Sequence, residues 1–565
     1  YMGASVNSPP AFVGGRINMA YDKGTVLGSS SYVDYKTLKT TLPPTIFAAT
    51  NDGKVHVLNA AKDDTTLPGI PAGTELAQFM PKGAMAAQIE LAKPNYSFRY
   101  TLDGPVVDHD IYDKHGKTPA GGPAKWRQLV FGTAGRAGSF MYGLESPMNT
   151  NNRTPTKDHF LWELDKNTTG YDDLANVTNN PTAGQLTDDT WVVLTGSGHY
   201  AGPGKQVGLY VVEALTGKRK GFIPLPAGYG NDDTANGGNR GLGAVVAVRD
   251  ANRKIVAAYA GDANGNLWRF DLRSTPFRVS YDRPLFTTPG GKRQPIYAAP
   301  AWQAHPGSSN SCTYSAASQC GAIVMVGTGI LLDDDDLKTP ATQQAIYGIW
   351  DQTPIGSGDK AGFNKVMTTD LVEQTIDLSS VKNGALREAG KTFYQVSSNT
   401  VDWNTKKGWF LKLGVITYPG AMALGERVVG DLSNFGSSVV IASFLPQERD
   451  LTVESCTGAG SLPNNIYVLD ALTGKNTRAF DHDANGAFDS YSVVSIQQGG
   501  YTRGNVISQN RDGQPNEGTI DLKPTPTCTG ATGFLTGGGG TMPIGNVCPV
   551  TGWRRSWAPV VSPPF

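Results

Sequence analysis

One short sequence pattern recurs along this chain and constrains its fold more than any other feature. Each copy reads apolar, aromatic or His, any residue, apolar, and usually ends in Asp, Glu or Asn. The copies are VHVLN (55–59), MYGLE (141–145), LYVVE (209–213), LWRFD (267–271), IYGIW before Asp351 (346–350), IYVLD (466–470) and a looser WFLKL (409–413). Their starts lie roughly 57 to 86 residues apart, which indicates one shared core strand with insertions of varied length.

The copies predict strands rather than helices, because they are short and rich in β-branched and aromatic residues. Two of them precede ALTGK, at 214–218 and 471–475, which is typical of a tight turn. Strand–turn units at this period are typical of propeller blades, which cannot bury their faces alone. We therefore expect an all-β fold, a modified β-propeller of about seven blades, as a single domain over 1–565. A β-sandwich whose strands are similar by coincidence is the alternative.

Three stretches are interpreted as long inserted loops rather than as blades. They are 61–100, 146–190 and the Gly-rich 528–548. The polar stretch 146–190 is expected at the surface. The run DDDD at 333–336 is interpreted as a solvated acidic loop, since adjacent carboxylates on an extended chain point to opposite faces and do not converge on a cation.

Composition excludes some partners. The 565 residues carry no net charge, so no global field favours nucleic acid or an anionic membrane. No apolar run approaches the roughly 18 residues of a membrane-spanning helix. The first residues lack the basic-then-apolar layout of a signal peptide, so either a signal was removed or the chain is the later part of a longer one.

The cysteines indicate an exported protein in an oxidising compartment. Cys312 and Cys320 bracket a short polar loop, and Cys528 and Cys548 bracket a Gly-rich one. Such loops suit disulfides, and neither pair has the CxxC spacing of zinc ligands. Cys456 is left free or with a partner outside the chain.

The stretch DHDANGAFD (481–489) predicts a calcium loop. Oxygen-bearing residues at alternate positions can converge on one hard cation, and Gly486 permits the sharp turn that this requires. The predicted ligands are Asp481, Asp483, Asn485, the backbone carbonyl of Ala487, and Asp489. The usual distal Glu is replaced by Ser492, so Asp489 would close the sphere. His482 alternates with the ligands and is expected to face solvent. The alternative is an acidic turn without an ion.

A second stretch matches only the first positions of this ligand pattern. Asp250 and Asn252 fit it, but Lys254 places an ammonium where the cation would bind. The residues that follow, 262–266, are interpreted as a hairpin turn of type I′ character around Gly265. We therefore expect no calcium at either turn.

Enzymatic motifs do not appear in the sequence. There is no HExxH, no P-loop and no GxSxG. His56 and His199 lie beside predicted strands and are interpreted as packed or surface side chains. Quinoprotein dehydrogenases, which hold pyrroloquinoline quinone and Ca²⁺, have similar propellers, but the adjacent cysteines that they commonly carry do not occur here. We expect no enzyme, with such a dehydrogenase or a metal-free scaffold as the alternatives.

The chain resembles the C-terminal half of the PilC/PilY family of type IV pilus adhesins and biogenesis factors. The similar stretches include LDGPVVDHD (102–110), AYAGDANGNLWRFDL (258–272), QQAIYGIWD (343–351) and GWRRSWAPV (552–560). The resemblance implies a quinoprotein-like propeller at the pilus tip, outside the cell. It also implies minor pilins of the tip complex and a host or abiotic surface as partners, and a role in pilus assembly, twitching motility and attachment.

The resemblance also bears on calcium, which in this family is linked to control of pilus extension against retraction. Family loops read D-x-[DN]-x-[DN]-x-x-x-D, and residues 481–489 match this form. The family's other frequent loop precedes YAGD, where this chain is shorter and carries Lys254. The resemblance therefore implies that calcium acts through 481–489, or that Lys254 imitates a permanently bound cation.

Overall fold

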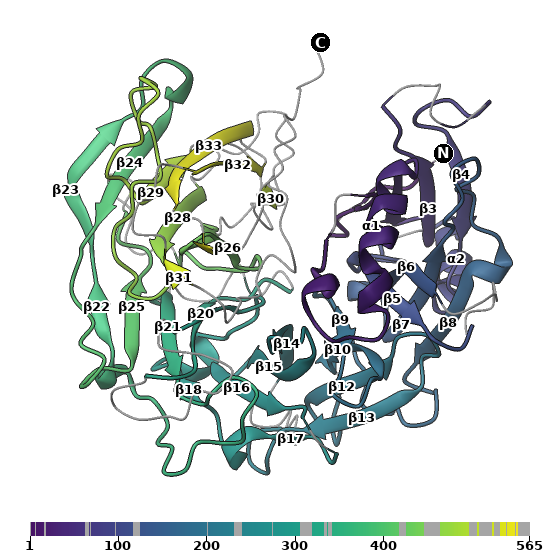
Figure 1. The fold of residues 1–565 in the computed structure, drawn as a ribbon, viewed down its shortest axis with the longest axis horizontal. Coiled ribbons are helices and arrows are strands. Elements are labelled where there is room, and N and C mark those ends of the chain that lie inside the picture. Colours follow the sequence, from purple (N-terminus) through teal and green to yellow (C-terminus); the bar gives the residue numbers. More distant parts are fainter. Residues whose placement is uncertain are drawn as a thin grey trace. The chain divides into compact units, whose positions relative to one another are not determined.

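The chain forms two compact units, Tyr1–Leu285 and Phe286–Phe565, which are described one at a time (Figure 1). The computed structural model describes residues 2–5, 7–15, 18–62, 67, 69–95, 98–116, 125–200, 202–230, 240–273, 275–305, 319–332, 336, 342–416, 425–445, 464–496, 506–507, 523–524, 531–537, 540–547 and 550–551. That 1–565 folds as a single domain stays a prediction.

The first unit holds four sheets in which strands close in sequence pair antiparallel. Their strands are β1 (Ala11–Val13), β2 (Thr45–Thr50), β3 (Lys54–Asn59) and β4 (Glu75–Phe79); β5 (Val106–Asp113), β6 (Lys125–Thr133), β7 (Phe140–Ser146) and β8 (Phe160–Asp165); β9 (Thr182–Gln185), β10 (Trp191–Gly196), β12 (Gly208–Glu213) and β13 (Arg219–Pro224); and β11 (Gly198–His199), β14 (Gly241–Arg249), β15 (Ile255–Asp262), β16 (Asn266–Asp271) and β17 (Arg278–Val279). Consecutive antiparallel sheets of this kind are the arrangement that the recurring pattern predicts.

Helices are few in the described ranges. The two α-helices there are α1 (Tyr32–Thr41) and α2 (Lys82–Leu91). Neither these nor any other helix in the described ranges has the length and apolar character needed to cross a bilayer.

The second unit contains larger and less regular sheets. Its strands are β19 (Ala301–Ala304), β20 (Ala322–Gly327), β21 (Ala345–Asp351), β25 (Gly408–Lys412) and β22 (Val372–Gln374); β23 (Ile376–Asn383), β24 (Lys391–Val396), β29 (Val493–Ile496), β28 (Asn464–Asp470), β27 (Ser438–Ser443) and β26 (Ser433–Phe435); β30 (Val506–Ile507), β32 (Ala531–Gly537) and β33 (Gly540–Val547); and β31 (Lys523–Pro524) with β34 (Val550–Thr551). Across both units, the described residues form seven sheets of three or more strands, in agreement with about seven blades.

Six copies of the recurring pattern are inner strands of six different sheets. They lie in β3, β7, β12, β16, β21 and β28, and each pairs with a strand on both sides. Apart from the half-buried Leu58, their apolar residues are buried on both faces, which explains why the copies are nearly continuous apolar runs.

The seventh copy, 409–413, does not mark a further blade. It forms β25, which pairs antiparallel with β21, so two copies share one sheet. The reason is the chain between them, because it adds β22 to the same sheet and then β23 and β24 to the next one before it returns. Assigning one blade to each copy was therefore wrong at this position.

The repeated ALTGK turns pack on tryptophans. In the first unit, Trp162 lies between Gly143 of its own sheet and Gly217 of the turn, and a Cβ at either glycine would come within 3 Å of the indole. The Trp162 Nε1 donates to Ala214 O at 2.9 Å. The second unit repeats this arrangement with Trp409, Gly348 and Gly474. The ALTGK turn thus recurs because its glycine packs against a tryptophan in both units.

Two of the predicted insertions contain blade strands. The stretch 61–100 includes β4 and α2, and 146–190 includes β8 and β9. Because β4, β8 and β9 pair within sheets, interpreting these stretches wholly as inserted loops was wrong. Most of 528–548 consists of β32 and β33, and the rest lies outside the described residues.

Several sequence predictions fall wholly or partly outside the described residues. Cys320 is buried and disulfide-bonded, whereas the other four cysteines are not described, so their pairing stays a prediction. In the acidic run 333–336 only Asp336 is described. It is buried, and its carboxylate accepts from Leu332 N at 2.7 Å, so this residue is not a solvated one.

Buried charges fix α1 to β5. The Lys39 Nζ lies 2.8 Å from Asp110 Oδ2, and both side chains are almost fully buried. The hydroxyls of Tyr32 and Tyr35 donate to the same carboxylate. Asp108, two residues earlier in β5, is also buried. In the described part of the chain its Oδ2 has no hydrogen-bond partner. Burial raises the pKa of Asp108 to about 7.

Candidate calcium loop

The loop 481–489 lies within the connection between β28 and β29 and is closed at its base. Phe480 and Asp489 form an isolated antiparallel bridge, in which Asp489 N donates to Phe480 O at 2.8 Å. The nine predicted loop residues are therefore one structural element, because the chain returns to its starting point at the last of them.

The first half of the loop brings three predicted ligands together. The Asp481 carboxylate accepts from Asn485 N at 3.1 Å and from Gly486 N at 2.8 Å. Asp483 Oδ2 accepts from the Asn485 side-chain amide at 3.0 Å. Gly486 has φ of 91°, a left-handed conformation that the sharp turn requires and that glycine adopts without strain. Local hydrogen bonds to Asp and Asn side chains thus wind the chain.

The second half of the loop departs from the sequence expectation at His482. Its Nδ1 lies 2.5 Å from Asp489 Oδ2, and its ring packs against Tyr491. The side chain is 23% exposed, so the prediction that it faces solvent was wrong. The physical reason is that alternation of side chains holds for an extended strand, whereas this loop curls and places His482 and Asp489 on the same side.

A cluster of metal-ligating atoms results. One atom each from His482, Asp483 and Asp489 lies within 4.8 Å of the others. Asp481 does not belong to this cluster. Burial, followed by the carboxylates of Asp489 and Asp483, raises the pKa of Tyr491. The negative potential and the oxygen donors fit a hard cation such as Ca²⁺, although binding by the predicted set stays a prediction.

The degenerate stretch beside Lys254 is a tight hairpin between β14 and β15. Asp250 Oδ1 accepts from Lys254 N at 3.0 Å, and Asp250 N donates to Lys254 O. The Lys254 ammonium points away from this turn and lies 2.6 Å from Asp189 Oδ1, in the β9–β10 connection. The lysine therefore does not occupy the centre of its own loop.

The next turn, 262–266, is not of type I′. That type needs positive φ at both central residues, but between Asp262 and Asn266 only Gly265 has one, at 76°. Gly265 N donates to Asp262 O at 3.1 Å, as in a three-residue hairpin loop with a left-handed glycine. Asp262 selects this turn because its buried carboxylate accepts from the backbone N–H groups of Asn264 and Asn266.

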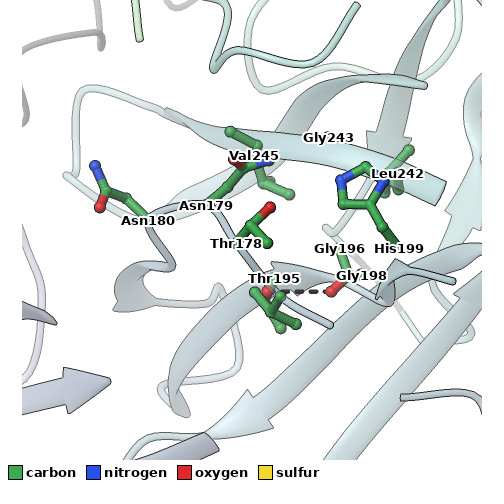
Figure 2. Close-up of a pocket in the computed structure, with 12 residues that line it drawn as sticks. Thr178, Asn179, Asn180, Thr195, Gly196, Gly198, His199, Leu242, Gly243 and Val245 are labelled. Carbon is green, nitrogen blue, oxygen red and sulfur yellow. Dashed lines mark hydrogen bonds between the residues drawn. The ribbon is translucent and has the colours of Figure 1, made fainter. Parts of the chain in front are cut away.

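The two histidines singled out in the sequence are packed. His56 is buried between Asp52 and Glu75, with Nε2 at 3.0 Å from Asp52 Oδ2. His199, in β11, borders a small hollow of about 10 Å³ with Thr178 and Leu242 (Figure 2). Burial lowers the pKa of His199 to about 4, so the ring is neutral at physiological pH.

Sequence reasoning missed two features of these sites. His482 joins the acidic cluster through a contact across seven residues, for which no periodic signal exists. Asp108 and Asp110 alternate in β5 like any strand residues, and their role depends on Lys39 from α1, about 70 residues earlier in the chain. A buried lysine is not visible in a sequence, because lysines are normally exposed.

Comparisons with known proteins agree with the fold. The sequence matches the family described as PilY1 beta-propeller domain over residues 2–387. It is 27% identical over 543 residues to the type IV pilus biogenesis factor PilY1 of Pseudomonas aeruginosa, covering 88% of this chain and 41% of the relative. A PilY1 homologue of Xylella fastidiosa is also 27% identical, covering 94% and 38% respectively. The chain thus spans about two fifths of the length of these relatives.

A solved structure is similar throughout its length. The crystal structure of the C-terminal domain of Pseudomonas aeruginosa PilY1 superimposes with a TM-score of 0.69 at 22% identity, covering 95% of this chain and all of that one. Together with the family match, this likeness confirms the predicted β-propeller. The family match ends before the loop 481–489, so it carries no information on that loop.

Proposed function

The chain belongs to the PilY1 beta-propeller family, and from this premise we propose that it is the propeller part of a calcium-responsive type IV pilus biogenesis factor. The family match over residues 2–387 carries the pilus assignment, supported by relatives that are named type IV pilus biogenesis factors. The proposed location is the cell surface at the pilus tip, and the proposed partners are minor pilins and a host or abiotic surface. No enzymatic activity is proposed.

Calcium would act through the loop 481–489. When bound by Asp481, Asp483, Asn485, the Ala487 carbonyl and Asp489, the ion would offset the repulsion between the carboxylates and hold the loop rigid. Since the loop lies in the connection between β28 and β29 and is closed onto Phe480, its geometry is coupled to one blade. Occupancy of the loop would then alter how the propeller engages the tip complex, and so the balance of pilus extension and retraction.

Calorimetric titration of the full chain with CaCl₂ tests this function. We expect one site in the wild type and at least tenfold weaker binding in Asp489→Ala, because a ligand that closes the sphere is lost. Asp172→Ala, which removes an exposed aspartate outside the loop, is the matched control and should bind as the wild type does. In cells, Asp489→Ala should change how the number of surface pili responds to calcium. Asp172→Ala should leave this response as in the wild type.

Other outcomes would contradict the proposal. Absence of calcium binding in the wild type would leave the loop as an acidic turn. Equal binding by Asp489→Ala would place calcium elsewhere in the chain. Unfolding of Asp489→Ala would make the loop a structural element rather than a switch.

A further inference from the structure

A second donor set lies in the loop 481–489 and is centred on a histidine. It consists of His482, Asp483 and Asp489, one ligand atom of each lying within 4.8 Å of the others. It differs from the predicted calcium set, because it contains a nitrogen and excludes Asp481. Imidazole with carboxylate is a typical donor set for Zn²⁺ and neighbouring metals, whereas Ca²⁺ takes oxygen ligands.

The histidine is held in place by groups outside the cluster. Its ring packs against Tyr491 and Phe393, with ring centroids 5.1 and 6.4 Å away. Its backbone oxygen accepts from Ala385 N at 3.0 Å. Such contacts fix the ring orientation and lower the entropy lost when a metal binds, as the outer-shell partners of metal-ligating histidines do. The side chain is nevertheless 23% exposed, so an ion can reach it.

The spacing suits an ion after a small adjustment. Two ligands of a tetrahedral zinc ion lie about 3.3 Å apart, given metal–ligand distances near 2 Å. His482 Nδ1 and Asp489 Oδ2, now 2.5 Å apart, would have to separate slightly. Asp483 would have to move inward, and it can do so because it is only half-buried and, among the described residues, is bonded only to its loop neighbour Asn485.

We propose that His482, Asp483 and Asp489 bind a divalent transition-metal ion of the Zn²⁺ class, with water in the remaining position. The same ion excludes Ca²⁺ from the loop, because Asp483 and Asp489 are needed by both. The exclusion of Ca²⁺ rests on the calcium function proposed above, but the transition-metal site does not.

Titration of the metal-free full chain with ZnCl₂ and, separately, with CaCl₂ tests the site in crossed variants. His482→Ala should weaken Zn²⁺ binding at least tenfold, the lower end of what loss of even an outer-shell partner causes, and leave Ca²⁺ binding unchanged. Asp481→Asn should weaken Ca²⁺ and leave Zn²⁺ unchanged. His115→Ala, which removes an exposed histidine of the first unit, is the matched control and should change neither.

Each result decides between the two sites. Zn²⁺ binding by His482→Ala with wild-type affinity overturns the proposal. His482→Gln, which preserves side-chain volume, should show the same loss of Zn²⁺ with an unchanged thermal unfolding curve, and an unchanged affinity there also overturns it. Loss of Zn²⁺ in both variants, with no Ca²⁺ binding in any, supports this site and contradicts the calcium function. Ca²⁺ binding that persists at saturating Zn²⁺ overturns the exclusion.

Discussion

The loop 481–489 and the β15–β16 turn at 262–266 contain similar residues, yet their carboxylates have different surroundings. In the turn, Asp262 is fully buried, and both of its oxygens accept hydrogen bonds. The donors are Asn264 N (2.9 Å), Asn266 N (2.9 Å), Asn266 Nδ2 (2.9 Å) and Trp268 Nε1 (2.8 Å). This turn satisfies its carboxylate from within the chain and needs no ion.

The loop 481–489 has more carboxylates than the turn 262–266, and fewer N–H donors for each of them. Asp483 is bonded to Asn485, and Asp489 to His482, both near the surface. The difference teaches that the supply of N–H donors within reach, rather than the presence of Asp, Asn and Gly, decides whether such a turn is self-sufficient. Acidic side chains that lack donors require a cation, a lysine or a proton.

Replacing Asp262 tests the self-sufficient turn and should be strongly destabilising. Asp262→Ala leaves several buried donors without an acceptor, so we expect the free energy of unfolding to fall by about 3 kcal/mol or more. Urea unfolding measures this. Asp489→Ala, measured without metal, is the comparison and should cost less than about 1 kcal/mol, because its carboxylate lies near the surface. Equal losses in the two variants would remove the contrast between turn and loop.

Asp108 tests the case in which a proton replaces the missing donors. Its pKa is about 7, chiefly through burial and, in addition, through Asp110, while Lys39 opposes the rise. The folded state therefore holds a proton that the unfolded state releases near pH 4, and stability falls as the pH rises from about 4 to about 7. A pKa difference of this size corresponds to a loss of up to about 4 kcal/mol.

Asp108→Asn should remove most of this pH dependence. The variant carries no titrating group at this position, so it should be more stable than the wild type at pH 8 and differ less at pH 4. Urea unfolding at the two pH values measures the change. A wild-type protein whose stability stays constant from pH 4 to 8 would contradict the assigned protonation.

The smallest effect is expected where a lysine serves as the cation. Lys254 pairs with Asp189, whose side chain is about half exposed, so Lys254→Met should change the free energy of unfolding by less than about 1 kcal/mol. Lys220→Met, which breaks the similar pair with Asp188, is the matched control. Calcium stoichiometry, measured by calorimetry, should stay the same, and a new site in Lys254→Met would show that the ammonium had kept an ion out.

The sequence predicted the features that depend on near neighbours. Six copies of the recurring pattern are inner strands of separate sheets, because alternation, β propensity and adjacent turns act over a few residues. The winding of 481–486 followed from Asp, Asn and Gly at fixed spacing, since these side chains bond to the backbone two to five residues away.

Tertiary structure decided the rest. Three contacts depend on how the chain folds back on itself rather than on the spacing of residues in the sequence. They are the pairing of β25 with β21, the contact of His482 with Asp489 and the burial of Lys39 against Asp110. A sequence lists which groups carry charge. Whether a carboxylate meets donors, a lysine, a proton or an ion depends on which other segments pack beside it, because a hydrogen bond or an ion pair needs its two groups within a few ångströms of each other in space.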